Sequence, residues 1–170
     1  MMMKKLIILV CFILLFGQAG FAQSENHKAI SVGLGPEFNM NARENFAGAL
    51  SLSIDYQLPV QLAIGLSVIG SANFSETNVL EAAGIFRWYI LGDNHTGLFV
   101  QTDLGLHLIS ERSVIKPMFG GGLRAGYRLL LGESFYIEPY GRFGFPYFYG
   151  VGVLAGMPFR FSAKASNSGE

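Results

Sequence analysis

The sequence is short of charge, of cysteine and of long apolar runs, and each shortage excludes a class of protein. Charged residues make up 14% of the 170 residues, with 12 basic residues balanced by 12 acidic ones. An average soluble domain carries about 25% charged residues. Since no run of basic residues is present, a nucleic-acid partner is not expected. Cys11 is the only cysteine, so the chain beyond it has no disulfide, no thiolate catalysis and no cysteine metal site.

The start of the chain has the pattern of a secretory signal. Two lysines precede the apolar residues 6–16, and small residues then lead to Ala22 and Gln23. An apolar run of this length is shorter than the roughly 20 residues that a membrane-spanning helix needs. We therefore expect residues 1–22 to be a signal peptide cleaved between Ala22 and Gln23, rather than a membrane anchor.

What is abundant is apolar, aromatic and small. Hydrophobic residues make up 51% of the chain, which also contains 22 glycines, 15 phenylalanines and seven tyrosines. This composition excludes a disordered chain, because disordered segments are polar and poor in aromatic residues. Residues 23–161 have the length of one domain. Residues 162–170 show no hydrophobic period, and we expect them to be a disordered C-terminal tail.

Beyond the leader, hydrophobic residues alternate with small or polar ones, as they do when successive side chains point to opposite faces of a strand. No later segment is apolar for long enough to predict a transmembrane helix. The alternating segments are residues 30–38, 46–56, 62–70, 80–90, 98–108, 119–131, 135–145 and 149–161. The segment 80–90 also fits a helix, because Glu81 and Arg87 suit either period.

The segments between these strands are rich in turn residues, which favours hairpins. Short connectors are predicted at 58–60, 92–95 and 132–134, and somewhat longer ones at 39–45, 71–77, 110–116 and around Pro146. Strands joined in this way predict an up-and-down antiparallel sheet.

The polar faces of the strands are built from small residues and ten charges. The acids are Glu37, Asp55, Glu81, Asp103 and Glu138, and the bases are Arg87, Arg124, Arg128, Arg142 and Arg160. Small residues suit the crowded interior of a narrow barrel. Every base on these faces is arginine, whose planar fork satisfies carboxylates in buried ion pairs. We therefore expect these ten residues to form an ionic cluster inside a barrel.

The apolar faces are aliphatic in the middle and aromatic near the strand ends. One set of rings is Phe38, Phe46, Phe74, Phe119, Phe143 and Phe145, and the other is Tyr56, Trp88, Tyr127, Phe135, Phe159 and Phe161. Two aromatic belts around an aliphatic band are typical of a barrel between two lipid interfaces. Only a closed sheet spans lipid, because closure leaves no unpaired edge. The sequence thus predicts an all-β fold, a closed antiparallel up-and-down transmembrane β-barrel of eight strands, with ten strands as the alternative count. A soluble lipocalin-like or sandwich domain is the alternative. In such a domain, both the apolar and the small-residue faces of the strands would point the wrong way for their chemistry.

With its leader, its strand count and an aromatic-ended last segment at 150–161, the chain resembles the small bacterial outer-membrane β-barrels of the OmpA transmembrane-domain and OmpX type. The resemblance covers residues 28–161. It implies a bacterial outer-membrane location, a periplasmic N-terminus and contact with outer-membrane lipids. It also implies periplasmic chaperones and the barrel assembly machinery as partners during biogenesis. Family members often end on the final aromatic residue, whereas nine residues follow Phe161 here.

Motifs for chemistry are few. Gly120, Gly122 and Ala125 match the spacing of a dinucleotide fingerprint, but they lie in a predicted strand and not at the start of a helix. The three histidines lack metal spacing. Asp103 and His107 share a strand face about 13 Å apart, so any acid–base partner of His107 must come from another strand. We predict no catalytic residue, no cofactor and no metal.

The function that this pattern favours is a structural or accessory outer-membrane barrel whose lumen is plugged by ion pairs. The alternatives are a surface binding or adhesion protein, a lipid-modifying outer-membrane enzyme and a narrow small-solute channel. The sequence identifies no surface ligand.

Overall fold

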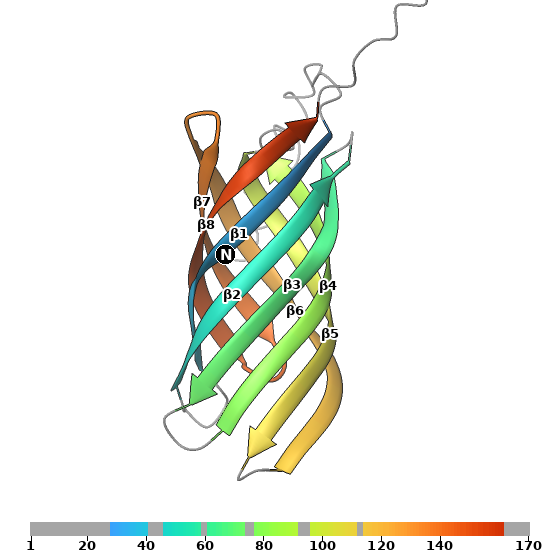
Figure 1. Ribbon diagram of the computed structural model, residues 1–170, viewed down its shortest axis with the longest axis vertical. Helices are drawn as coiled ribbons and strands as arrows, with labels where there is room; N and C mark the ends of the chain where they lie inside the picture. The colour runs from blue at the N-terminus through green and yellow to red at the C-terminus, as the bar shows by residue number, and fades with distance from the viewer. Residues whose placement is uncertain are drawn as a thin grey trace, which may run out of the picture.

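The computed structural model describes residues 28–40, 46–58, 61–73, 77–91, 96–111 and 114–161, which form a barrel of eight strands (Figure 1). The strands are β1 (Lys28–Met40), β2 (Phe46–Gln57), β3 (Leu62–Asn73), β4 (Thr77–Leu91), β5 (Gly97–Glu111), β6 (Val114–Leu131), β7 (Phe135–Gly144) and β8 (Tyr149–Phe161). Each strand pairs antiparallel with its neighbours in sequence, and β8 pairs with β1 to close the sheet. The predicted closed up-and-down barrel of eight strands is confirmed, and residues 80–90 are strand and not helix.

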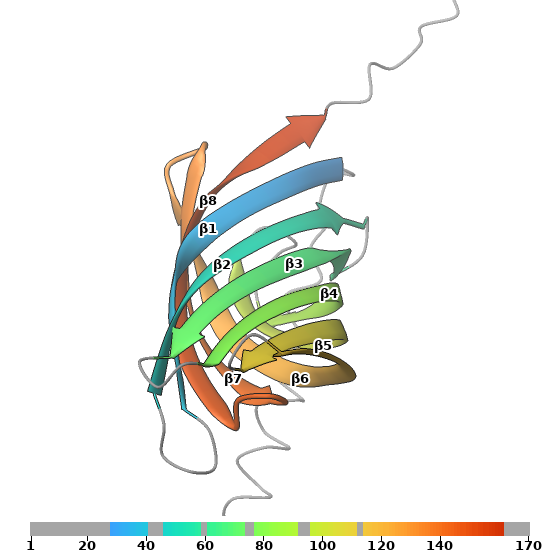
Figure 2. The ribbon, with the colours of Figure 1, turned by 60° about the horizontal axis from the view of Figure 1, so that its bottom comes forward.

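Two rims bound the barrel. The lower rim in Figure 1 is where β1, β3, β5 and β7 end, and the upper rim is where β2, β4, β6 and β8 end. The strands have 10–18 residues, and they run obliquely around the barrel, as the turned view of Figure 2 shows. Transmembrane strands need about 9–11 tilted residues, so each strand is long enough for such a span.

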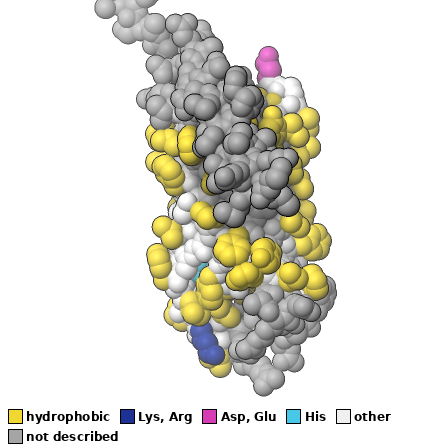
Figure 3. All heavy atoms as spheres, turned by 180° about the vertical axis from the view of Figure 1, so that it is seen from behind, with side chains coloured by type: hydrophobic (Ala, Val, Ile, Leu, Met, Phe, Trp, Pro, Cys, Tyr) yellow, Lys and Arg dark blue, Asp and Glu magenta, His cyan; other side chains and the backbone are white. Residues whose placement is uncertain are grey.

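Alternation assigns the two faces as the sequence predicted. Along β1, Ser31 and Glu37 are fully buried, whereas Leu34 and Phe38 are half or more exposed. The same inversion holds around the barrel, where the exposed large side chains are almost all leucine, isoleucine, valine or aromatic. Hydrophobic side chains recur between white atoms over the part of the surface that is not grey in Figure 3, and Lys, Arg, Asp and Glu side chains are visible only near its ends.

Both rims carry exposed rings. Phe38, Phe46, Phe119 and Phe143 lie toward the lower rim, and Trp88, Tyr127, Phe135 and Phe159 lie toward the upper rim. Most rings of each predicted belt are therefore exposed near the expected rim, and Tyr56 is half-buried. Phe74 and the side chain of Phe161 lie outside the described residues.

The predicted connector at 110–116 is mostly strand. Two others, 39–45 and 71–77, are shorter than predicted, because β1 continues to Met40, β3 continues to Asn73 and β4 begins at Thr77. Residues 110–116 were expected to link two strands, but β5 continues to Glu111 and β6 begins at Val114. The pairs Ser110↔Ile115 and Ile109↔Lys116 extend the ladder through this stretch. β-branched residues favour extended backbone, and Val114 with Ile115 outweighs the polar residues around them.

No helix among the described residues is long and apolar enough to cross a membrane. The predicted signal, its cleavage position at Ala22 and Gln23, and the predicted tail at 162–170 lie outside the described residues.

Candidate functional site

The interior of the barrel is the candidate site, because it gathers the predicted charges. Nine of the ten predicted residues are at most 3% exposed: Glu37, Asp55, Glu81, Arg87, Asp103, Arg124, Arg128, Glu138 and Arg142. The side chain of Arg160 lies outside the described residues. Each charged residue lies on the same face of its strand as the small residues. In the closed barrel this face points inward, toward the barrel axis.

Four charges from four strands form the first group, which we call the tetrad: Asp55, Arg87, Arg128 and Glu138. Arg87 donates hydrogen bonds to Glu138 from both terminal nitrogens, at 2.9 and 3.0 Å. Arg128 donates from Nε to Glu138 at 2.7 Å and from Nη2 to Asp55 at 3.1 Å. Since these strands are β2, β4, β6 and β7, the tetrad connects distant parts of the wall across the lumen.

Neutral side chains complete the tetrad. The Gln101 carbonyl accepts from Arg87 Nε at 2.8 Å, and the Ser31 hydroxyl accepts from Arg128 Nη1 at 3.2 Å. The Gln101 amide in turn donates to Asp103 at 2.5 Å. Apart from Asp55 Oδ1, the charged atoms of the tetrad are hydrogen-bonded, which a buried ion pair requires to offset its desolvation.

The second group lies nearer the lower rim, and we call it the triad: Glu37, Glu81 and Arg142. Arg142 donates to Glu37 at 3.0 Å through one terminal nitrogen and to both oxygens of Glu81, at 2.8 and 3.0 Å, through the other. Glu37 also accepts from the Tyr140 hydroxyl at 2.6 Å and from the Asn39 amide at 2.8 Å. One guanidinium therefore holds two carboxylates from strands that are not neighbours, β1 and β4.

His107 joins the triad from the strand next to Glu81. Glu81 and His107 are cross-strand partners, and Nδ1 of His107 lies 3.5 Å from the Glu81 carboxylate. The expectation that a partner of His107 comes from another strand is therefore confirmed. Neither Nδ1 nor Nε2 of His107 has a hydrogen-bond partner among the described residues.

Asp103 and Arg124 form a looser pair between the two groups, with 3.4 Å between the nearest charged atoms. No nitrogen of the Arg124 guanidinium has a hydrogen-bond partner among the described residues. Its plane instead lies 4.4 Å from the centre of the Tyr140 ring. This pair is the least satisfied part of the network.

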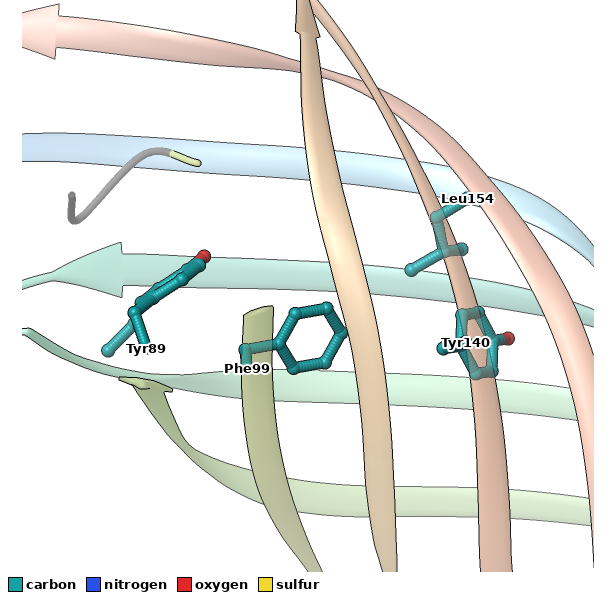
Figure 4. Packing of buried hydrophobic residues seen from close by; sticks show 5 residues of the cluster. Tyr89, Phe99, Tyr140 and Leu154 are labelled. Carbon is teal, nitrogen blue, oxygen red and sulfur yellow. The ribbon is translucent and has the colours of Figure 1, made fainter. Parts of the chain in front are cut away.

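Aromatic rings inside the barrel were missed by the sequence reasoning, which emphasised small interior residues. Tyr89, Phe99 and Tyr136 are at most 1% exposed, and they stack on the arginines. Arg87 lies 4.3 Å from the Phe99 ring and Arg128 lies 4.1 Å from the Tyr136 ring. Figure 4 shows Tyr89 and Phe99 side by side in the interior. The available signal was the alternation of faces, because Tyr89 and Tyr136 are each two residues from a predicted interior charge and Phe99 is four residues from Asp103.

The lower end of the lumen is covered by apolar side chains. Tyr147, in the connection between β7 and β8, is buried against Ala47 and Val79, with Ile109 beside them. Burial raises the pKa of the Tyr147 hydroxyl. Phe145 was expected in the outer belt, but its ring lies edge-on to buried His107 with 5.5 Å between centres. Phe145 is still 39% exposed, and it turns toward His107 because β7 ends at Gly144 and the alternation ends with it.

Among the described residues, no group of three or more histidine, cysteine or acidic side chains is placed to hold a metal ion. Gly120, Gly122 and Ala125 lie within β6 and not at the start of a helix, so they lack the context that the dinucleotide fingerprint requires.

Comparison with known proteins gives a likeness of fold. No family model and no curated protein matches the chain. Among solved structures, Neisserial surface protein A aligns over 79% of this chain and 97% of its own, with a TM-score of 0.59 and 9% identity. Two designed transmembrane β-barrels align over 82% of this chain at 15% identity, with TM-scores of 0.42 and 0.43.

Proposed function

We propose that this chain is an integral bacterial outer-membrane β-barrel protein with a structural or accessory role, whose lumen is closed by the tetrad, the triad and the Asp103–Arg124 pair. The observation that carries the proposal is the inversion of the barrel. Large apolar side chains are exposed around the wall, and charged side chains are fully buried at its centre.

Lipid is the solvent that accounts for the outer wall. A soluble monomer rarely exposes more than a few hundred Å² of contiguous apolar surface, whereas here leucine, valine and aromatic residues are exposed on every strand. Exposed charge among the described side chains is confined to Lys116, near the start of β6, and Glu133, in the turn after it. Both lie near a rim, where a membrane protein meets water.

The outer membrane is favoured over other membranes by the resemblance of the sequence and by the fold shared with Neisserial surface protein A. In the proposed orientation the N-terminus is periplasmic, so the lower rim faces outward. Periplasmic chaperones and the barrel assembly machinery would act on the chain during biogenesis.

A wide pore does not fit this lumen. Eight strands enclose a space just wide enough for side chains, and here arginines and tyrosines from several strands meet inside it. We therefore propose closure as the role of the network.

Membrane fractionation combined with gel mobility before and after heating tests the proposal. We expect the protein in the outer-membrane fraction and a faster-migrating band without heating, because a closed barrel resists detergent until it is boiled. A protein that stays monomeric in buffer without detergent would contradict the inverted arrangement and every inference from it.

Surface adhesion is the second candidate and has weaker support. The chain between strands at the lower rim is limited to residues 41–45, 74–76, 112–113 and 145–148. A stable protein interface buries about 800 Å² on each partner, which such short connections supply poorly. We also propose no catalytic role, and lipid A of altered mass in cells that express the protein would contradict this.

A further inference from the structure

Among the described side chains, the triad is the ionic group whose charges do not balance. The tetrad has two carboxylates and two guanidiniums, and the Asp103–Arg124 pair has one of each. The triad has the carboxylates of Glu37 and Glu81 but only the guanidinium of Arg142. All three side chains are at most 3% exposed. Since a buried charge without a partner is costly, the triad lacks one positive charge.

His107 lies where that charge is needed. Its side chain is fully buried, and Nδ1 lies 3.5 Å from the Glu81 carboxylate. Because neither ring nitrogen has a hydrogen-bond partner among the described residues, no such bond holds the ring in its neutral form. Imidazole is the side chain that gains or loses a proton near neutral pH. With that proton, His107 presents a cation to the carboxylate beside it.

The other neighbours of His107 do not supply the charge. Its cross-strand partner on β6 is Met118, and the ring of Phe145 lies edge-on to it. Tyr147 lies in the connection after β7, and burial raises the pKa of its hydroxyl, so it stays uncharged at neutral pH. The charged or titratable groups around His107 and the triad are Glu37 of β1, Glu81 of β4, Tyr140 and Arg142 of β7 and Tyr147.

We propose that the triad and His107 form a proton-binding site, in which one proton taken up on folding makes His107 the second cation of the cluster. This inference rests on the proposed function, because a lumen open to bulk water would screen the unbalanced charge. Glu81 then lies between the Arg142 guanidinium and the imidazolium, and the four side chains are neutral in sum. The closure at the outward end of the barrel therefore responds to pH.

Proton uptake on folding makes the barrel less stable in alkaline solution. An unfolded chain releases the histidine proton above about pH 6.5, whereas the folded cluster keeps it. The folded state then holds one proton more than the unfolded state, so stability falls as pH rises. For one proton, the unfolding equilibrium constant rises by up to about tenfold per pH unit. Below about pH 6 both states hold the proton, and this dependence disappears.

The test is urea unfolding of the full-length barrel in detergent micelles between about pH 6 and 9, read by gel mobility. We expect the unfolding equilibrium constant to rise with pH in the unaltered chain. His95→Gln is the matched control, since it removes a histidine outside the described residues, and it should keep the rise. His107→Gln should lose the rise, because an amide takes up no proton in this range. Glu81→Gln should lose it too, because the cluster is then balanced without a proton.

Three results would overturn the proton site. A rise that persists in His107→Gln would place the proton on a carboxylate and not on His107. An unaltered, heat-modifiable barrel with no rise would bind no proton in the cluster. If the variants fail to fold, NMR of the carbon-bound ring proton of His107 in the unaltered barrel decides, and a neutral imidazole at about pH 7 would remove the site. A chain whose mobility does not shift on heating would instead count against the proposed membrane barrel itself.

Discussion

Two interior arginines with equal burial are held very differently. Arg142 donates to Glu37 and Glu81 with three hydrogen bonds, whereas Arg124 has one ion contact at 3.4 Å and no hydrogen bond from its guanidinium among the described residues. Burial alone therefore does not show which arginine contributes more to stability. We expect that contribution to follow the number of carboxylates that each arginine neutralises.

We expect Arg142→Ala to destabilise the barrel much more than Arg124→Ala. The first change leaves two carboxylates without their shared cation, and breaking a buried ion pair costs about 3–5 kcal/mol. Arg124→Ala leaves only one carboxylate, that of Asp103, without its cation. Asp103 also keeps its hydrogen bond from Gln101. The measurement is the urea midpoint of folded barrels in detergent micelles, read by gel mobility.

Glu133→Ala is the control for both arginine variants. Glu133 is exposed in the turn between β6 and β7, and loss of an exposed charge changes stability by about 0–1 kcal/mol. If Arg142→Ala unfolded at the same urea concentration as Glu133→Ala, Arg142 would face water and the triad would not exist in solution.

At the scale of elements, glycines of β8 leave room for the tyrosine rings of the neighbouring strand β7. Tyr136 and Tyr140 of β7 project inward beside β8, where Gly156 and Gly152 leave room for them. A Cβ on Gly152 would overlap the Tyr140 ring, and one on Gly156 would overlap Tyr136. Small residues on one strand therefore position the rings of the next.

Gly152→Val should destabilise the barrel by about 1–3 kcal/mol, the usual cost of overpacking. The displaced Tyr140 ring also loses its hydrogen bond to Glu37, so the change reaches the triad. Gly141→Val on β7 is the matched control, because a Cβ there makes only an ordinary contact at 3.9 Å. Urea unfolding of the two variants compares them, and equal midpoints would show that the glycine does not make room for the ring.

The strands and their faces could be predicted because both depend on local alternation. Glu81 and Arg87 fall on one parity of β4, and the structure buries both. Prediction failed where alternation gives no information. The extension of β5 and β6 through residues 110–116 depends on pairing between the two strands, and Phe145 turns toward His107 after its strand has ended.

The choice of ionic partners could not be predicted either. Glu138 binds Arg87 and Arg128, which are 51 and 10 residues away in the sequence. Which side chains meet at the axis depends on the stagger of all eight strands around the barrel, and a single strand carries no signal for it. A count of five acids and five arginines predicted that pairs would form, but not which ones.

At the scale of the whole molecule, the charged groups follow one another along the axis, and the proposed closure is therefore serial. The tetrad lies toward the upper rim, the Asp103–Arg124 pair follows, then the triad, and Tyr147 covers the lower end. On β4 and β5 the same order is visible, from Arg87 and Gln101 to Glu81 and His107. An ion that crosses the lumen must therefore pass every layer.

Serial closure predicts how conductance responds to mutation. In planar bilayers the unaltered barrel should show no stable open channel, and Arg142→Ala should show none either, because the tetrad still closes the lumen. Glu138→Ala leaves the triad in place and should also remain closed. If refolded, heat-modifiable protein gave steady, ion-selective steps in its unaltered form, the lumen would be open and the network would line a channel. Conductance in Arg142→Ala alone would show that the triad is the only barrier, since the layers would then not act in series.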